Sequence, residues 1–340
     1  MRKIMLLASC IIACIVAGPA AAAPRNILLI LADDYGIDVT RYYPTTDRRT
    51  TTPPAPATPK LAALAQNGLL FRNAWAEPSC SPTRATIFTG RYAFRTGIGK
   101  PVPDNLSLPA PILSVNSFSL PEAFTASGKN YYLAHIGKWH LSRGIDDPKT
   151  HGWPHFSGPH PNLAHVPDYY DWPKVVDGVE VNSHVHTYAP TDQVNDAIAA
   201  MSAAKVAGQP YFALSSPHAP YQKPPVALLN AYKGVPATGA SRRTYYEAMI
   251  EAMDTEIGRL MAAADLAHTN TRVIFLGDNG TPNEVTAKPY NTDHAKLRVY
   301  EQGVRVPMIV AGSGVVNSGR KLTGLVNTVD LYPTLSLIHI

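Results

Sequence analysis

The residues most able to do chemistry surround Cys80, in the segment Pro78–Gly90 with the sequence PSCSPTRATIFTG. Ser81 and Pro82 predict a helix that begins here, with Ser81 as the N-cap and Pro82 in the first turn. Cys80 would then face the positive end of the helix, where anions bind and thiols are activated. Arg84, also in the first turn, would pair with a group carried by residue 80. The alternative is a buried structural cysteine beside an ordinary capped helix.

The other two cysteines leave Cys80 without a disulfide partner. Cys10 and Cys14 lie in residues 1–23, which have the pattern of a secretory signal, with a basic start, an apolar core and small residues before Pro24. The core is too short for stable membrane insertion, so the pattern predicts export to the periplasm or the medium. A lipoprotein signal is the alternative, because both cysteines end sequences that resemble lipidation boxes. In an exported protein, a lone cysteine needs an explanation other than an internal disulfide.

The composition bounds the class of protein. The 340 residues carry a formal net charge of +5, which falls to +3 without residues 1–23 because these hold two basic residues and no acidic one. A mild positive charge suits an anionic substrate, but it is also ordinary for an enzyme. No basic block with interleaved aromatic residues is present, so nucleic-acid binding has no support. The length fits one large α/β domain.

Four apolar runs of strand length each end in polar residues. They are Asn26–Leu31 before Asp33 and Asp34, Asn130–Ile136 before Lys138 and His140, Tyr211–Ser215 before His218, and Arg272–Leu276 before Asp278 and Asn279. Helical spacing of apolar residues is clearest at 192–206 and 244–264. This alternation predicts an α/β fold with a mostly parallel, mixed central sheet and helices on both faces. Because ligands bind beyond the carboxyl ends of such strands, we expect the polar residues to converge.

Asp33, Asp34, Asp278 and Asn279 are the predicted metal ligands. Three carboxylates and one amide oxygen suit a hard divalent cation, Ca²⁺ or, with water completing the shell, Mg²⁺. A zinc site would instead require histidine or thiolate ligands at close spacing. Taken singly, Asp-Asn-Gly is more often a turn and Asp-Asp often a helix cap, so the prediction depends on their joint placement.

The chain resembles the type I sulfatases, which are formylglycine-dependent, arylsulfatase-like members of the alkaline-phosphatase-like superfamily. Pro78–Gly90 is similar to the family signature, whose core is Cys-x-Pro-x-Arg. Other motifs follow the family order, and they are Asp33–Gly36, Gly137–His140, Ser216–Pro220, Asp278–Gly280, Lys296–Pro307 and Asp330–Leu335. Two departures are Asn130–Leu133, where the family usually has Gly-Tyr-x-Thr, and Ser142, where glycine is common. The resemblance implies hydrolysis of an aryl or carbohydrate sulfate ester by a sulfatase-like fold.

The resemblance also implies a modified residue and a set of catalytic roles. A formylglycine-generating enzyme would oxidise Cys80 to an aldehyde, whose hydrate attacks sulfur with help from Asp278. The cation would be held by residue 80 together with Asp33, Asp34, Asp278 and Asn279. Sulfate oxygens would be neutralised by Arg84, Lys138 and Lys296. His218, helped by Lys296, would protonate the leaving alcohol. His140 would take the proton of the remaining hydroxyl so that sulfate is released.

The expected organisation is a signal at residues 1–23, a sulfatase catalytic domain at 24–335 and a non-native tail at 336–340. Family members usually continue into a small C-terminal subdomain, and LSLIHI at 335–340 resembles translated adapter sequence, so we interpret the chain as truncated. Residues 175–181 predict a tight hairpin.

The substrate is the least determined feature. Trp153, Trp172 and Tyr169 are predicted to stack on a sugar or aryl group, whereas His184 and His186 form either a secondary metal site or a solvated hairpin face. The competing functions are a phosphonate or phosphate monoester hydrolase of the same superfamily and a non-catalytic anion-binding fragment.

Overall fold

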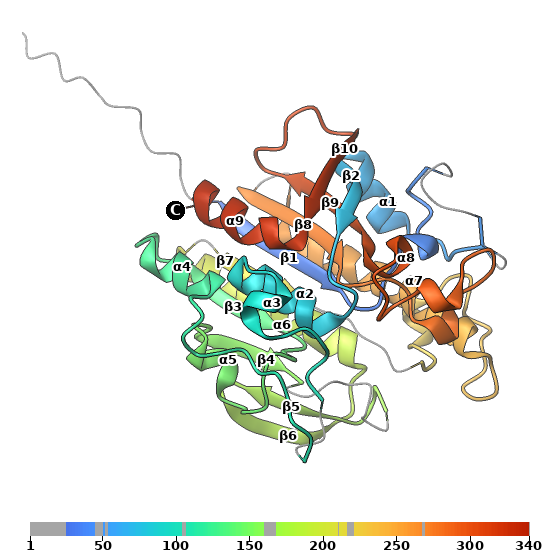
Figure 1. Cartoon of the computed structure of the whole chain (residues 1–340), viewed down its shortest axis with the longest axis horizontal. Helices are drawn as coiled ribbons and strands as arrows, with labels where there is room; N and C mark the ends of the chain where they lie inside the picture. Colours follow the sequence, from blue (N-terminus) through green and yellow to red (C-terminus); the bar gives the residue numbers. More distant parts are fainter. Residues whose placement is uncertain are drawn as a thin grey trace, which may run out of the picture.

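The computed structural model describes residues 25–44, 50–51, 54–103, 107–159, 168–209, 211–215, 221–266 and 269–339. The centre of the fold is a ten-stranded sheet in the order β10-β2-β9-β8-β1-β7-β3-β4-β5-β6 (Figure 1). Its strands are β1 (Asn26–Ala32), β2 (Gly68–Trp75), β3 (Tyr132–Ile136), β4 (His155–Gly158), β5 (Trp172–Val176), β6 (Val179–Val185), β7 (Tyr211–Ser215), β8 (Thr271–Gly277), β9 (Arg305–Gly312) and β10 (Arg320–Asn327). The predicted signal and His218 lie outside the described residues.

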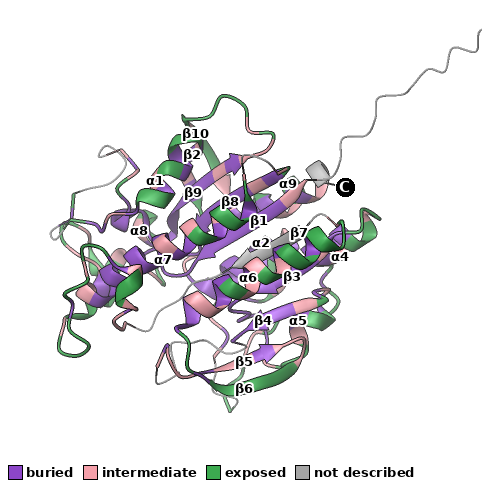
Figure 2. Ribbon diagram, turned by 180° about the vertical axis from the view of Figure 1, so that it is seen from behind, coloured by how far each residue is buried: buried purple, intermediate pink, exposed green. Residues whose placement is uncertain are grey.

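Helices cover both faces of the sheet. They are α1 (Pro59–Gln66), α2 (Cys80–Thr89), α3 (Ala93–Thr96), α4 (Leu120–Ala126), α5 (Asp147–Thr150), α6 (Ala189–Val206), α7 (Arg242–Ala264), α8 (Glu301–Val304) and α9 (Leu331–His339). The helices α2, α4 and α9 lie on the face seen in Figure 1, and α1, α6 and α7 lie on the face that Figure 2 turns forward. Leu28 and Ile30 of β1 pack in the core layer of α1, α6 and α7, whereas Ile27 and Leu29 pack in the opposite layer. Burial on both faces explains the continuous apolar run of β1.

The four strands that precede the predicted site residues are neighbours in the sheet. They lie in the order β8-β1-β7-β3, and each adjacent pair is parallel. Their carboxyl ends therefore meet at one edge. Antiparallel pairing at β9, β5 and β6 makes the sheet mixed. The predicted fold class, an α/β sheet with helices on both faces, is confirmed.

Element boundaries differ from the prediction by a few residues. The strand β3 begins at Tyr132, because Asn130 has a φ of 52° and belongs to the turn before it. The helix α6 begins at Ala189 rather than Asp192, since Pro190 fits a first turn. The predicted hairpin is present between β5 and β6, and its turn residues Asp177 and Gly178 have φ values of 50° and 87°.

The predicted aromatic substrate platform is wrong. Trp153, Trp172 and Tyr169 are 1%, 0% and 0% exposed, so none of them presents a ring to solvent. Trp153, for example, packs edge-on against Phe88 and His135. These large rings stabilise the core because each one buries a large apolar area.

Along the described part of the chain, no helix combines the length and apolarity needed to cross a bilayer.

Candidate active site

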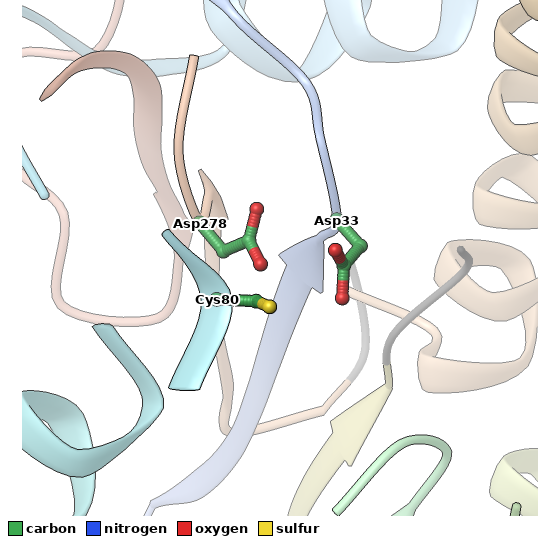
Figure 3. A group of neighbouring side chains, drawn as sticks. All are labelled: Asp33, Cys80 and Asp278. Atoms are coloured by element: carbon green, nitrogen blue, oxygen red, sulfur yellow. The ribbon is translucent and has the colours of Figure 1, made fainter. Parts of the chain in front are cut away.

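The carboxyl edge of the sheet gathers the predicted site residues that the structure describes. They are Asp33 and Asp34 after β1, Lys138 and His140 after β3, Asp278 and Asn279 after β8, Cys80 and Arg84 on α2, and Lys296 between β8 and α8. All are buried except Lys296, whose side chain is 18% exposed. Figure 3 shows Asp33, Cys80 and Asp278 pointing into one space, and their ligand atoms all lie within 4.8 Å of one another.

The helix α2 begins at Cys80, so the predicted cap is wrong. Its N-cap residue is Ser79, and Ser81 lies inside the first turn. The Ser81 hydroxyl donates to the His140 carbonyl at 2.7 Å and accepts from the Val102 N–H at 3.0 Å. Tertiary contacts therefore use the hydroxyl that local preference would assign to capping. Cys80, 2% exposed, still lies at the positive end of the helix.

A buried charge cluster lies beside Cys80. Arg84 Nη2 and Lys138 Nζ both donate to Asp33 Oδ2, at 2.8 Å and 3.0 Å, and all three side chains are fully buried. Arg84 Nη1 also donates to the Lys138 carbonyl at 2.5 Å. Buried charges persist when they are paired and hydrogen-bonded. Two cations against one carboxylate leave positive charge toward residue 80, which suits a bound anion.

Carboxylate and amide oxygens gather on the other side of Cys80. The Asp34 N–H donates to Asp278 Oδ1, and Asn279 Nδ2 donates to Asp34 Oδ1, each at 2.8 Å. Asp278 Oδ2 and Asn279 Oδ1 are buried and find no hydrogen-bond partner among the described residues. Burial raises the pKa of Asp278 well above its ordinary value, and Asp33, Asp34 and Cys80 raise it further. A hard cation would satisfy these oxygens, so the donor set fits Ca²⁺ or Mg²⁺.

Lys296 is the third cation of the site, after Arg84 and Lys138. Its Nζ contacts Asp34 Oδ1. Burial alone would lower the pKa of Lys296, but Asp34, Cys80, Asp33 and Asp278 together raise it above its ordinary value. Lys296 therefore stays charged at neutral pH.

His140 is held as a neutral acceptor that faces residue 80. Its Nδ1 lies 3.3 Å from Cys80 Sγ, and its Nε2 lies 2.8 Å from the Val102 carbonyl. Because a carbonyl only accepts, Nε2 carries the proton and Nδ1 is the acceptor. Burial lowers the pKa of His140 to about 3, and Lys138 and Arg84 lower it further. The ring is therefore neutral, and its Nδ1 can accept a hydrogen bond from a group on residue 80.

Three contributors to the site were missed by sequence reasoning. The Tyr246 hydroxyl donates to the Asp34 carbonyl at 2.6 Å, His135 Nε2 contacts the Lys138 carbonyl at 3.1 Å, and the Val102 carbonyl orients His140. Each acts on or through a backbone carbonyl. A contact of this kind with a distant segment leaves no local sequence pattern.

The hairpin histidines do not build a second metal centre among the described residues. His184 Nδ1 lies 2.7 Å from Asp171 Oδ1 in an exposed pair. Within the described ranges, the three side chains that lie close enough together to hold one metal ion are Asp33, Cys80 and Asp278. The exposed hairpin face agrees with the solvated alternative.

A family model described as Sulfatase matches residues 25–337. N-acetylgalactosamine-6-sulfatase from Canis lupus familiaris is 30% identical over 92% of this chain and 62% of its own length. Arylsulfatase A from Bos taurus is 30% identical over 95% of this chain and 65% of its own length. The chain thus spans less than two thirds of these relatives.

Solved structures show the same fold. Ps i-CgsB, in complex with k-i-k-neocarrahexaose, gives a TM-score of 0.74 at 24% identity, covering 93% of this chain and 72% of that one. The PsFucS1 sulfatase from Pseudoalteromonas sp. gives a TM-score of 0.73 at 23% identity, and the match covers 93% of this chain and 67% of that one. Because the family model matches almost all of the described chain, this protein belongs to the sulfatase family.

Proposed function

We propose that this protein hydrolyses a sulfate ester to an alcohol and sulfate, with residue 80 as the source of the nucleophile and a divalent cation beside it. The observation that carries the proposal is the position of Cys80. It lies at the positive end of α2, with His140 Nδ1 at 3.3 Å and the Asp33 and Asp278 oxygens within 4.8 Å. A buried cysteine with only a structural role would not require this surrounding charge.

The cation is proposed from the oxygen donors. Asp33, Asp34, Asp278, Asn279 and the modified residue 80 would hold it. When bound, it would withdraw electrons from the sulfate group and stabilise negative charge in the transition state. Calcium is our first choice because it accepts many oxygen ligands in flexible geometry, and magnesium is the alternative.

Residue 80 is proposed to be formylglycine, made from Cys80 by a formylglycine-generating enzyme. The aldehyde hydrate would supply an oxygen nucleophile and a second hydroxyl for expelling sulfate. Cys80 is 2% exposed in the folded chain, so the modifying enzyme would act before folding is complete. We also propose export on the signal at residues 1–23, which is consistent with a single cysteine after its removal.

The side chains around residue 80 divide into proton carriers and charge stabilisers. Asp278 would take the proton of the attacking hydroxyl, and His140 Nδ1 would take the second one. His218 is the proposed donor to the leaving alcohol. The sulfate oxygens would lie against the three cations that surround the site, Arg84, Lys138 and Lys296.

Activity on matched esters tests this function. We expect the converted full chain to hydrolyse 4-nitrophenyl sulfate or N-acetylgalactosamine 6-sulfate with a kcat/KM at least about 100-fold above that for 4-nitrophenyl phosphate. Sugar sulfates belong in the test because one relative is named for such a substrate. A preference for phosphate would favour the phosphate monoester hydrolase. No hydrolysis of either ester by protein whose residue 80 is an aldehyde would favour anion binding without catalysis.

Metal removal is expected to destabilise the protein. At a calcium concentration about 100 times the Kd, bound cation contributes about 2.7 kcal/mol, which corresponds to a Tm increase of about 4 °C for a chain of this length. Differential scanning fluorimetry with calcium and with a chelator measures the difference. Asn279→Ala should reduce the shift, whereas the exposed Asp293→Ala should keep it. Equal Tm values with and without Ca²⁺ or Mg²⁺ would contradict a cation at this site.

A further inference from the structure

We propose that Tyr246 of α7 is a positioning residue whose hydroxyl sets the affinity of the site for its divalent cation, by holding the backbone at Asp34. This inference rests on the proposed cation site and adds a residue outside its ligand set. Tyr246 lies far from the ligands in sequence and is 4% exposed. Its hydroxyl donates to the Asp34 carbonyl at 2.6 Å.

Asp34 needs such a tether because of its backbone. Its φ of 59° lies in the left-handed region, which costs an aspartate less than most residues with a Cβ but is still less favourable than a negative φ. From this conformation the Asp34 N–H donates to Asp278 Oδ1 at 2.8 Å. One backbone unit therefore carries its own carboxylate and orients a second one. If Asp34 relaxes to a negative φ, both carboxylates change position.

The Tyr246 ring is itself held firmly. The Arg243 guanidinium lies over the ring at 5.9 Å, and the Tyr221 ring meets it edge-on at 5.9 Å and 89°. Packing from these two neighbours restricts the ring, so its hydroxyl is presented in one place. A ligand oriented by a fixed hydrogen bond binds its ion more tightly than a mobile one.

The same hydroxyl also lies beside the segment that carries Lys296. Tyr246 Oη is 3.4 Å from Thr281 Oγ1, and the Thr281 carbonyl accepts from the Lys296 N–H at 3.1 Å. Thr281 Oγ1 in turn donates to Asp38 Oδ1 at 2.6 Å. The two partners of the Asp34–Lys296 ion pair are thus anchored around one buried phenol.

Tyr246→Phe tests the proposal, because it keeps the ring and deletes the donor. Calorimetric titration of the full, unconverted chain with Ca²⁺ alone should show a Kd about 10–100-fold weaker than in the parent protein. In the converted enzyme, kcat/KM should fall at limiting calcium and recover to within a few-fold at saturating calcium. The matched control is Tyr245→Phe, the adjacent residue of α7, whose hydroxyl accepts from the Ala240 N–H at 3.1 Å. It should bind calcium with unchanged affinity.

Each outcome decides the matter. Equal calcium affinity in Tyr246→Phe and the parent, or an equal loss in Tyr245→Phe, would overturn the positioning role. So would a Tyr246→Phe chain that stays unfolded at every calcium concentration while Tyr245→Phe folds, because the hydroxyl would then act on the fold. A parent protein that binds no Ca²⁺ in either its unconverted or its converted form would overturn the cation site as well, and this separates the two failures.

Discussion

Cys80→Ala is expected to abolish sulfate ester hydrolysis, lowering kcat/KM by at least about 10³-fold, because the substitution removes the only source of the proposed nucleophile. The loss should be confined to chemistry. Sγ makes a 3.3 Å contact with His140, and its deletion removes one small buried atom from a site that other residues hold together. The Tm should therefore fall by only a few degrees. Steady-state kinetics and scanning fluorimetry on the same preparations measure both quantities.

The matched control is Thr271→Ala. Thr271 is also fully buried, but it begins β8, at the opposite end of the strand from Asp278. Its replacement should cost comparable stability and leave kcat/KM within about twofold. Retained hydrolysis in Cys80→Ala, with normal folding, would show that residue 80 is not the nucleophile.

Arg84→Ala is expected to damage both activity and stability. The substitution removes the ion pair from Arg84 to the buried Asp33 carboxylate and the hydrogen bond from Arg84 to the Lys138 carbonyl. Asp33 keeps its ion pair with Lys138, and the Lys138 carbonyl keeps its contact with His135. Because a buried ion pair loses one partner, we expect a loss of about 3–5 kcal/mol in the free energy of unfolding. The lost charge toward the sulfate should lower kcat by about 10²–10³-fold in protein that still folds. Urea unfolding and steady-state kinetics measure the two effects.

Arg84→Lys separates charge from geometry. Lysine keeps the positive charge, but it lacks the planar fork that reaches Asp33 Oδ2 and the Lys138 carbonyl together. We expect it to recover part of the stability and little of the activity. Arg95→Lys, at an exposed arginine of α3, should change neither. Near-parental kcat in Arg84→Lys would mean that only the charge matters.

Much of the fold was predictable because buried parallel strands leave a clear pattern. The apolar runs at 26–31 and 272–276 fall within β1 and β8, and the polar residues after them lie at one edge of the sheet. Their convergence was expected from the general rule that ligands bind beyond the carboxyl ends of parallel strands, which needs no side-chain detail.

Contacts between distant segments were not predictable from local pattern. Ser81 has the preferences of an N-cap residue, yet its hydroxyl joins His140 and Val102. The Tyr246 hydroxyl contacts the carbonyl of Asp34, and His135 contacts the carbonyl of Lys138. Every residue has a backbone carbonyl, so such contacts cannot be recognised from the types of the residues involved. The prediction that Trp153 and Trp172 contact the substrate was wrong because both side chains are buried. An aromatic residue in a loop-rich stretch can equally anchor that stretch to the core.

The most direct measurement relates activity to the chemical state of residue 80. Full-length protein made with graded amounts of a formylglycine-generating enzyme would be digested, and mass spectrometry of the peptide containing residue 80 would give the fraction present as aldehyde. We expect specific activity on a sulfate ester to rise in proportion to this fraction and to extrapolate to zero for protein that retains only the thiol. Undiminished hydrolysis by protein whose residue 80 is entirely cysteine would contradict the account.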